Sequence, residues 1–119
     1  MQDGFHIEGV DVQAALVRVR GKIDSYKKLA GLFRGDGLAK LGQIEASFTG
    51  RDIAAYSFFA HTLRGSAATI GADGFAAVCG ELEAAGKRRD WDFIAARHAA
   101  FMSALRTLLA DIGTALGEG

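Results

Sequence analysis

The sequence contains no proline and only one cysteine among its 119 residues. Proline is the strongest helix breaker, so its absence allows long helices, and alanine and leucine recur in every segment. A sheet protein with many turns is therefore not expected, and we predict an all-α fold. Cys79 has no partner for an internal disulfide, and its neighbours Val78 and Leu82 predict a buried thiol in a reducing compartment.

The chain also lacks an excess of charge of either sign, because 14 basic and 14 acidic residues cancel. Domains that bind nucleic acid usually carry a basic surface, so nucleic acid is not an expected partner. The stretch Met1–Val10 contains Asp3, His6 and Glu8, which is not typical of a signal peptide. No apolar run approaches the roughly 18 residues that span a bilayer. We expect a cytoplasmic domain without direct membrane contact.

What the sequence has in quantity is apolar residues, which make up 50% of the chain. A chain of this size and composition can bury a core without metal or disulfide crosslinks. We predict a single domain over residues 1–119, with residues 1–9 as a mobile tail, and a monomer as the default state. The 16 glycines lie mostly between periodic segments, where glycine often ends a helix.

Apolar residues at helical spacing predict six helices, and Gly35-Asp36-Gly37 predicts a break between the second and the third. Asp11 and Asp90 are the expected N-caps of the first and the last helix. Short connections favour antiparallel neighbours, so we predict an antiparallel four-helix bundle with one or two short N-terminal helices. The predicted helices cover about residues 11–19, 24–34, 38–48, 52–70, 72–86 and 90 to the C-terminus.

The helix predicted over residues 52–70 has an unusually bare face around His61. At about 100° per residue, Phe59, Leu63 and Ile70 lie opposite His61, so the imidazole is expected to face solvent. A helix surface that needs only solubility normally carries Glu, Lys, Gln or Arg. A partner is therefore expected to approach this face, on which His61 is accompanied by Ala54, Ser57, Gly65 and Ala68, with Phe58 at the margin.

His61 and Arg64 are interpreted as a nucleophile and an anion holder. Neutral imidazole is a good nucleophile near pH 7, and Arg64, one turn along, supplies a planar fork of donors to an anion bonded to the ring. Gly65 in mid-helix costs roughly 1 kcal/mol relative to alanine, which close approach by a partner would explain. The sequence has no phosphate-binding loop and no kinase-like set of acidic metal ligands, so a phosphoryl donor and its Mg²⁺ must come from a partner.

The run from Ala60 to Gly71 closely resembles the signature of bacterial histidine phosphotransfer (HPt) domains. That signature is a histidine followed by a basic residue at plus three, glycine at plus four and glycine at plus ten. The similarity extends over nearly the whole chain, through Gly9-Val10-Asp11-Val12, Tyr26, Phe33, Phe75, Cys79, Leu82 and Glu83.

The resemblance implies that His61 receives a phosphoryl group on Nε2 from an aspartyl phosphate of a receiver domain and passes it to another receiver. Arg64 would support the phosphoryl charge, although the family most often has lysine there, which puts the transfer rate in question more than competence. No cofactor is expected on this chain, since Mg²⁺ would be bound by the receiver. Such domains stand alone or end membrane-anchored hybrid sensor kinases.

The resemblance also implies a docking surface for the receiver around His61. Gly71 would let the helix end and the chain turn into the next helix. The residues expected at the docking surface are Gly65, Ser66, Ala68, Ser57 and Phe58.

Two other functions stay open at this point. A docking module that works without phosphorylation would use Phe58 and the small-residue face, and His61→Ala would leave its affinity nearly unchanged. An enzyme with His61 as general base would need a concave pocket and a second catalytic group, for which the sequence offers no candidate. His98 is expected to be a partly buried structural residue, and no histidine pair has a metal-ligand spacing, so no metal site is expected.

Overall fold

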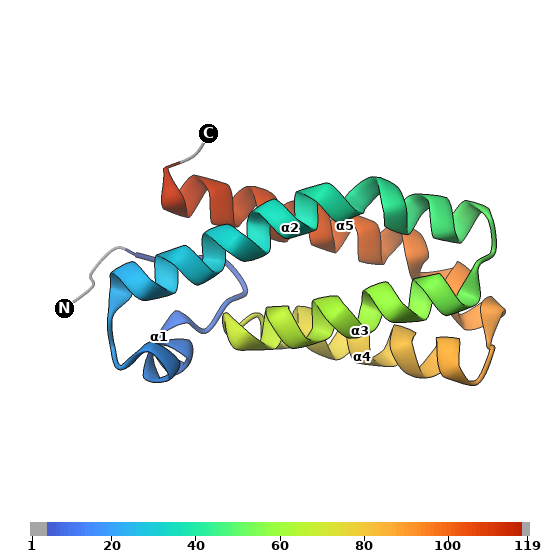
Figure 1. Ribbon diagram of the computed structural model, residues 1–119, viewed down its shortest axis with the longest axis horizontal. Helices are drawn as coiled ribbons and strands as arrows, with labels where there is room; N and C mark the ends of the chain where they lie inside the picture. Colours follow the sequence, from blue (N-terminus) through green and yellow to red (C-terminus); the bar gives the residue numbers. More distant parts are fainter. Residues whose placement is uncertain (1–4, 118–119) are drawn as a thin grey trace.

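The computed structural model describes residues 5–117, and this part of the chain contains helices and loops but no strand (Figure 1). The predicted all-α class is confirmed. The elements are α1 (Val12–Leu16), the 3₁₀ turn η1 (Val17–Val19), α2 (Ile23–Thr49), α3 (Ile53–Thr69), α4 (Asp73–Lys87) and α5 (Trp91–Leu116).

Helices α2 to α5 form the predicted antiparallel bundle. Helix α3 packs against α2 and α4, and α5 closes the ring by packing against α2 and α4. Figure 1 shows the long helices running back and forth along one axis, with α1 and η1 at one end of the bundle. The core between the helices includes Tyr26, Ile44, Tyr56, Leu63, Leu82, Ile94, Leu105 and Ile112, all at most 1% exposed.

Aspartate residues fix the starts of three helices. Asp11, Asp52 and Asp90 precede α1, α3 and α5, and each side chain accepts a hydrogen bond from the backbone N–H three residues later, at 3.0, 3.1 and 3.1 Å. Such caps satisfy N–H groups that have no partner inside the helix. The predicted N-caps Asp11 and Asp90 are confirmed.

The break predicted at Gly35-Asp36-Gly37 is wrong, because α2 continues without interruption over 27 residues. Gly37 is buried, and a Cβ there would lie 2.7 Å from Cδ2 of Leu109 on α5. This glycine therefore allows α2 and α5 to pack closely. A Cβ on Gly35 would meet nothing within 4 Å. Glycine inside a periodic pattern can end a helix or allow a neighbouring helix to pack closely, and the pattern alone does not distinguish these two roles.

Residues 1–4 of the tail predicted over residues 1–9 lie outside the described part of the chain. Residues 5–9 lie against the bundle. Ile7 is fully buried, and the ring of Phe5 packs edge-on against Tyr26 with centroids 6.1 Å apart. This segment packs onto the bundle although it has no helical periodicity.

Helix α5 is the one helix in the described residues that is long and apolar enough, by length and composition, to cross a membrane. Core helices of bundles pass the same test, and α5 packs against α2 and α4.

Helix α5 also carries His98, which is 5% exposed. His98 Nε2 lies 3.0 Å from Glu45 Oε1, and its Nδ1 lies 2.8 Å from the Tyr56 hydroxyl. A structural role for this histidine is confirmed.

Cys79 is fully buried in the same core, as predicted. Burial raises the pKa of its thiol to about 12. The cysteine is therefore a core residue and is protonated at neutral pH.

Candidate functional site

The imidazole of His61 projects from the exposed side of α3. The buried stripe of this helix consists of Tyr56, Ala60, Leu63 and Ala67, which face the core. His61 lies on the other side, with 59% of its side chain exposed. The predicted orientation of His61 is thus the one observed.

Glu83 on α4 determines which nitrogen of His61 is free. Its side chain is only 5% exposed, and its Oε2 lies 2.8 Å from Nδ1 of His61. An ionised carboxylate can only accept hydrogen bonds, so Nδ1 carries the proton of the neutral ring and donates to Glu83. The lone pair then lies on Nε2, which has no hydrogen-bond partner among residues 5–117. Nε2 is therefore the nucleophilic atom of this side chain.

Two cations share the same carboxylate. Nε of Arg64 lies 3.3 Å from Oε1 of Glu83, and Nζ of Lys87 lies 3.0 Å from Oε2. Arg64 is 49% exposed and Lys87 is 71% exposed, so both keep contact with solvent while they contact the buried acid. Their charges offset much of the cost of burying a carboxylate.

The pKa of Glu83 reflects these contacts. Burial alone would raise the pKa of this carboxyl, but hydrogen bonds from Lys87 and His61, together with the charges of Arg64 and Lys87, outweigh burial. The pKa is lowered from the usual 4.5. Glu83 is therefore ionised at neutral pH and keeps its partner nitrogen protonated.

Glycines on α4 bring this helix close enough to α3 for the contact. A Cβ on Gly86 would lie 2.6 Å from Cβ of Ser57, and a Cβ on Gly80 would lie 3.4 Å from Cδ of Arg64. The hydroxyl of Ser57 donates to the backbone carbonyl of Glu83 at 3.3 Å. The small residues where α3 and α4 meet thus allow Glu83 to come within hydrogen-bond distance of His61.

The predicted docking residues divide into two groups. Phe58 and Gly65 are open to solvent: Phe58 is 61% exposed, and a Cβ on Gly65 would meet nothing within 4 Å. The other three are half-buried, since Ser57 contacts α4, Ala68 packs against the core, and the Ser66 hydroxyl donates to the carbonyl of Thr62 at 3.0 Å.

Two hollows flank the exposed face of α3. One, of about 350 Å³, contains His61 and is lined by Ala54, Ser57, Phe58, His61, Glu83 and Lys87. The other, also of about 350 Å³, lies between α2 and α3 and is lined by Leu29, Leu32, Phe33, Asp36, Ser66, Thr69 and Ile70. The exposed face of α3 around His61 is therefore flanked by a hollow on each side.

Gly71 directly follows the C-cap of α3 and has a φ of 89°. Glycine adopts this left-handed conformation readily. A Cβ at this position would also lie 2.4 Å from the carbonyl oxygen of Asp11. The chain can thus turn into α4 while it contacts the segment before α1.

Sequence reasoning did not assign a role to Glu83 or Lys87. Lys87 belongs to the basic run Lys87-Arg88-Arg89, which in the sequence is most simply a solvated helix end. A signal was present, because Glu83 lies four residues after the buried Cys79 and so falls on the apolar side of its helix. No group of three or more potential metal-ligating side chains occurs among the described residues.

Comparison with known proteins gives one family. The family model described as Hpt domain matches residues 28–115, which include most of α2 and α5 and all of α3 and α4. No curated protein and no solved structure matches the chain. With nearly three quarters of its length covered by this match, the chain belongs to the Hpt domain family, the histidine phosphotransfer modules of phosphorelays.

Proposed function

We propose that His61 accepts a phosphoryl group from the aspartyl phosphate of a receiver domain and passes it to a second receiver. Membership of the Hpt family supports a phosphotransfer role. The observation that carries the assignment to His61 is the 2.8 Å contact between Nδ1 and Glu83, which leaves Nε2 as an exposed nucleophile.

The proposed step is a direct displacement at phosphorus. The Nε2 lone pair of His61 forms the N–P bond while the P–O bond to the receiver's aspartate breaks and its carboxylate leaves with the electron pair. The ring becomes positively charged, since Nδ1 keeps its proton. Glu83 is already ionised and in contact with this proton, so it stabilises the charge without rearranging. Transfer to the second receiver reverses the same step.

Arg64 and Lys87 would support the phosphoryl oxygens. Both side chains lie at the same carboxylate as His61, and Arg64 and Lys87 are 49% and 71% exposed. Arg64 offers a planar fork with several donors, whereas Lys87 offers a compact ammonium. Mg²⁺ would be supplied by the receiver, so this chain acts as a stoichiometric carrier.

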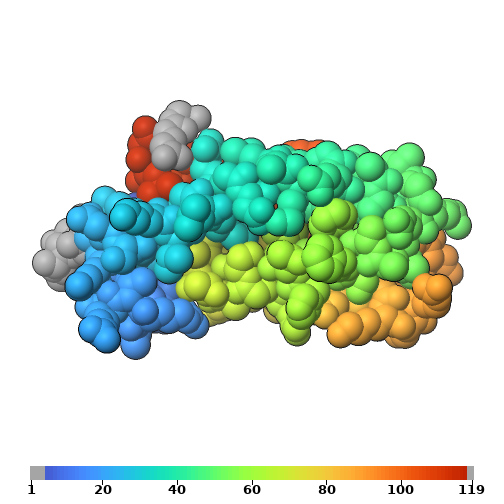
Figure 2. Space-filling view, viewed as in Figure 1, coloured from blue at the N-terminus to red at the C-terminus, as the bar shows by residue number. Residues whose placement is uncertain are grey.

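The proposed receiver surface extends from His61 across α3 to α2. Phe58 and Leu32 are 61% and 70% exposed, and large exposed apolar side chains are typical of protein docking surfaces. Gly65 is exposed on α3, and a Cβ there would meet nothing within 4 Å, which leaves room for a partner. Figure 2 shows α2 and α3 forming one continuous face of the molecule.

The same exposed apolar residues also fit a docking module that works without phosphorylation. Such a module has no need for a buried acid that fixes the tautomer of His61. The two functions differ in His61→Gln, which should abolish phosphotransfer in a carrier and leave partner affinity almost unchanged in a docking module.

The test is incubation of the purified protein with a panel of phosphorylated receiver domains. Wild type and His61→Gln are compared by intact mass and by stability of the adduct in acid and base. An acid-labile, base-stable adduct on wild type alone is expected. The absence of an adduct with every receiver in a panel that phosphorylates other Hpt domains would contradict the proposal.

A further inference from the structure

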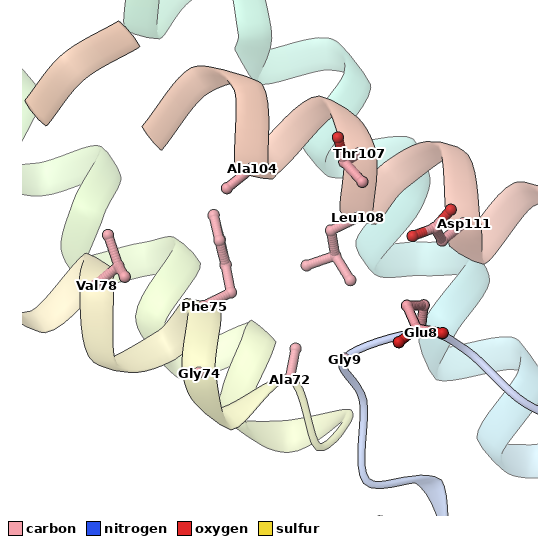
Figure 3. Close-up of a pocket in the computed structure, with 10 residues that line it drawn as sticks. All are labelled: Glu8, Gly9, Ala72, Gly74, Phe75, Val78, Ala104, Thr107, Leu108 and Asp111. Atoms are coloured by element: carbon pink, nitrogen blue, oxygen red, sulfur yellow. The ribbon is translucent and has the colours of Figure 1, made fainter. Parts of the chain in front are cut away.

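A separate hollow of about 440 Å³ lies on the α4–α5 side of the bundle (Figure 3). Of the described residues, none that forms a hydrogen bond or ion pair with His61 or Glu83 lines it. Its volume falls within the roughly 300–1,000 Å³ typical of small-molecule sites. The lining comes from the segment before α1, the start of α4 and the middle of α5: Glu8, Gly9, Ala72, Gly74, Phe75, Val78, Ala104, Thr107, Leu108 and Asp111.

The hollow has an apolar end and an acidic end. Figure 3 shows Glu8 and Asp111 on one side of the hollow, while Phe75 and Val78 lie on the other side. The ring of Phe75 is held by stacking on Phe101, with centroids 5.5 Å apart and planes 8° apart. The apolar end is therefore a formed surface that a ligand does not have to order.

The charges at the acidic end are not neutralised by the lining. Among residues 5–117, the lining of the hollow includes two carboxylates and no lysine, arginine or histidine. Between residues 5 and 117, the Asp111 carboxylate makes no ion pair or hydrogen bond, whereas Glu8 lies 3.4 Å from Nε2 of His6. The positive N-terminal end of the α4 helix dipole is already offset by the carboxylate of Asp73, in the first turn of that helix.

We propose that this hollow binds a small organic cation, an ammonium group attached to an aromatic or branched alkyl body. The ammonium contacts Asp111 and Glu8 through charge-assisted hydrogen bonds. The apolar body lies against Phe75, Val78 and Leu108 and is removed from water there. An anion of the same shape is repelled at the acidic end, and a neutral molecule of the same shape gains only the apolar contact.

The test uses the full chain labelled with ¹⁵N and three probes of similar shape: 2-phenylethylammonium, neutral 2-phenylethanol and anionic 3-phenylpropionate. Amide shifts of Phe75, Val78, Thr107 and Asp111 are followed during titration. The ammonium probe is expected to bind about tenfold more tightly than the alcohol, and the anion more weakly than both. Equal affinities of the three probes, or shifts confined to other parts of the chain, would overturn the proposal.

Two variants locate the site. Asp111→Asn should reduce the affinity of the ammonium probe about tenfold, to that of the alcohol, whereas Asp92→Asn, on the same helix but outside the hollow, should leave it unchanged. Ala104→Phe fills the hollow and should remove binding of both the ammonium probe and the alcohol. Unshifted amides of α2 and α3 in this variant report that the fold is intact. Ammonium binding that survives Ala104→Phe would also overturn the proposal. Phosphotransfer, assayed separately, tests His61 and not this hollow.

Discussion

Glu83 is the residue on which the contacts of the site converge. Its carboxylate, 5% exposed, contacts the imidazole of His61, the guanidinium of Arg64 and the ammonium of Lys87. His61 and Arg64 were identified from α3 alone, because their spacing within one helix is visible in the sequence. The role of Glu83 depends on how α3 packs against α4, because Glu83 lies 22 residues after His61 in the sequence. The periodicity of a single helix does not contain that information.

Replacing Glu83 with glutamine should slow phosphoryl transfer to His61 about 10- to 100-fold, in the range seen when one oriented electrostatic contact is lost. The amide is neutral and can present its N–H₂ to Nδ1, so it neither stabilises the charged ring nor fixes the tautomer. Single-turnover rates with a phosphorylated receiver measure the effect. Asp73→Asn, an exposed acid on the same helix, serves as the control, and an unchanged rate in Glu83→Gln would refute the role given to this residue.

Acidification should weaken the fold partly through Glu83. Its pKa is lowered in the folded state, so its contribution to the free energy of unfolding is complete above the usual value of 4.5 and is lost as pH falls through the lowered pKa. Urea unfolding between pH 7 and pH 3 should therefore show a steeper loss below 4.5 for wild type than for Glu83→Gln. Parallel curves for the two proteins would show that the contacts of Glu83 do not stabilise the fold.

At the scale of elements, the ends of the helices were more predictable than their continuity. The N-cap aspartates Asp11 and Asp90 act through a local hydrogen bond, which needs only the adjacent sequence. The continuity of α2 through Gly35 and Gly37 depends on α5, because the space that Gly37 leaves is occupied by Leu109.

Alanine at Gly37 and alanine at Gly35, both on α2, should have opposite effects. Gly37→Ala should lower the free energy of unfolding by about 1–3 kcal/mol, because its Cβ meets the buried Leu109 and overpacks the contact. Gly35→Ala is the matched control and should raise it by about 0.5–1 kcal/mol, since alanine is the better helix former and the site is open. Chemical denaturation measures both, and two changes of the same sign would contradict the close α2–α5 contact.

On the scale of the whole molecule, the two sites lie on different sides of one bundle. His61 projects from α3 next to α4, whereas the acidic hollow lies between α4, α5 and the N-terminal segment. The all-α class and the bundle followed from composition and periodicity. The packing of Ile7 did not, because a single apolar residue in an aperiodic segment gives no signal before the core around it is known.

Gly65 tests whether the α2–α3 face meets a receiver. No internal contact requires glycine there, so Gly65→Ala should stabilise the fold by about 0.5–1 kcal/mol. If a receiver approaches closely at this point, the same variant should bind it more weakly and accept phosphoryl more slowly. Denaturation and receiver titration on the same preparation separate the two effects. A variant that is more stable and transfers at the wild-type rate would place the receiver elsewhere.

Identification of the phosphorylated nitrogen tests the proposed role of His61 and Glu83 most directly. Protein labelled with ¹⁵N in its histidines would be phosphorylated by a receiver and examined by long-range ¹H–¹⁵N correlation NMR. We predict one phosphoryl group, on Nε2 of His61, with Nδ1 still protonated against Glu83 and with His6 and His98 unmodified. A phosphoryl group on Nδ1 of His61, or on either of the other histidines, would contradict this prediction.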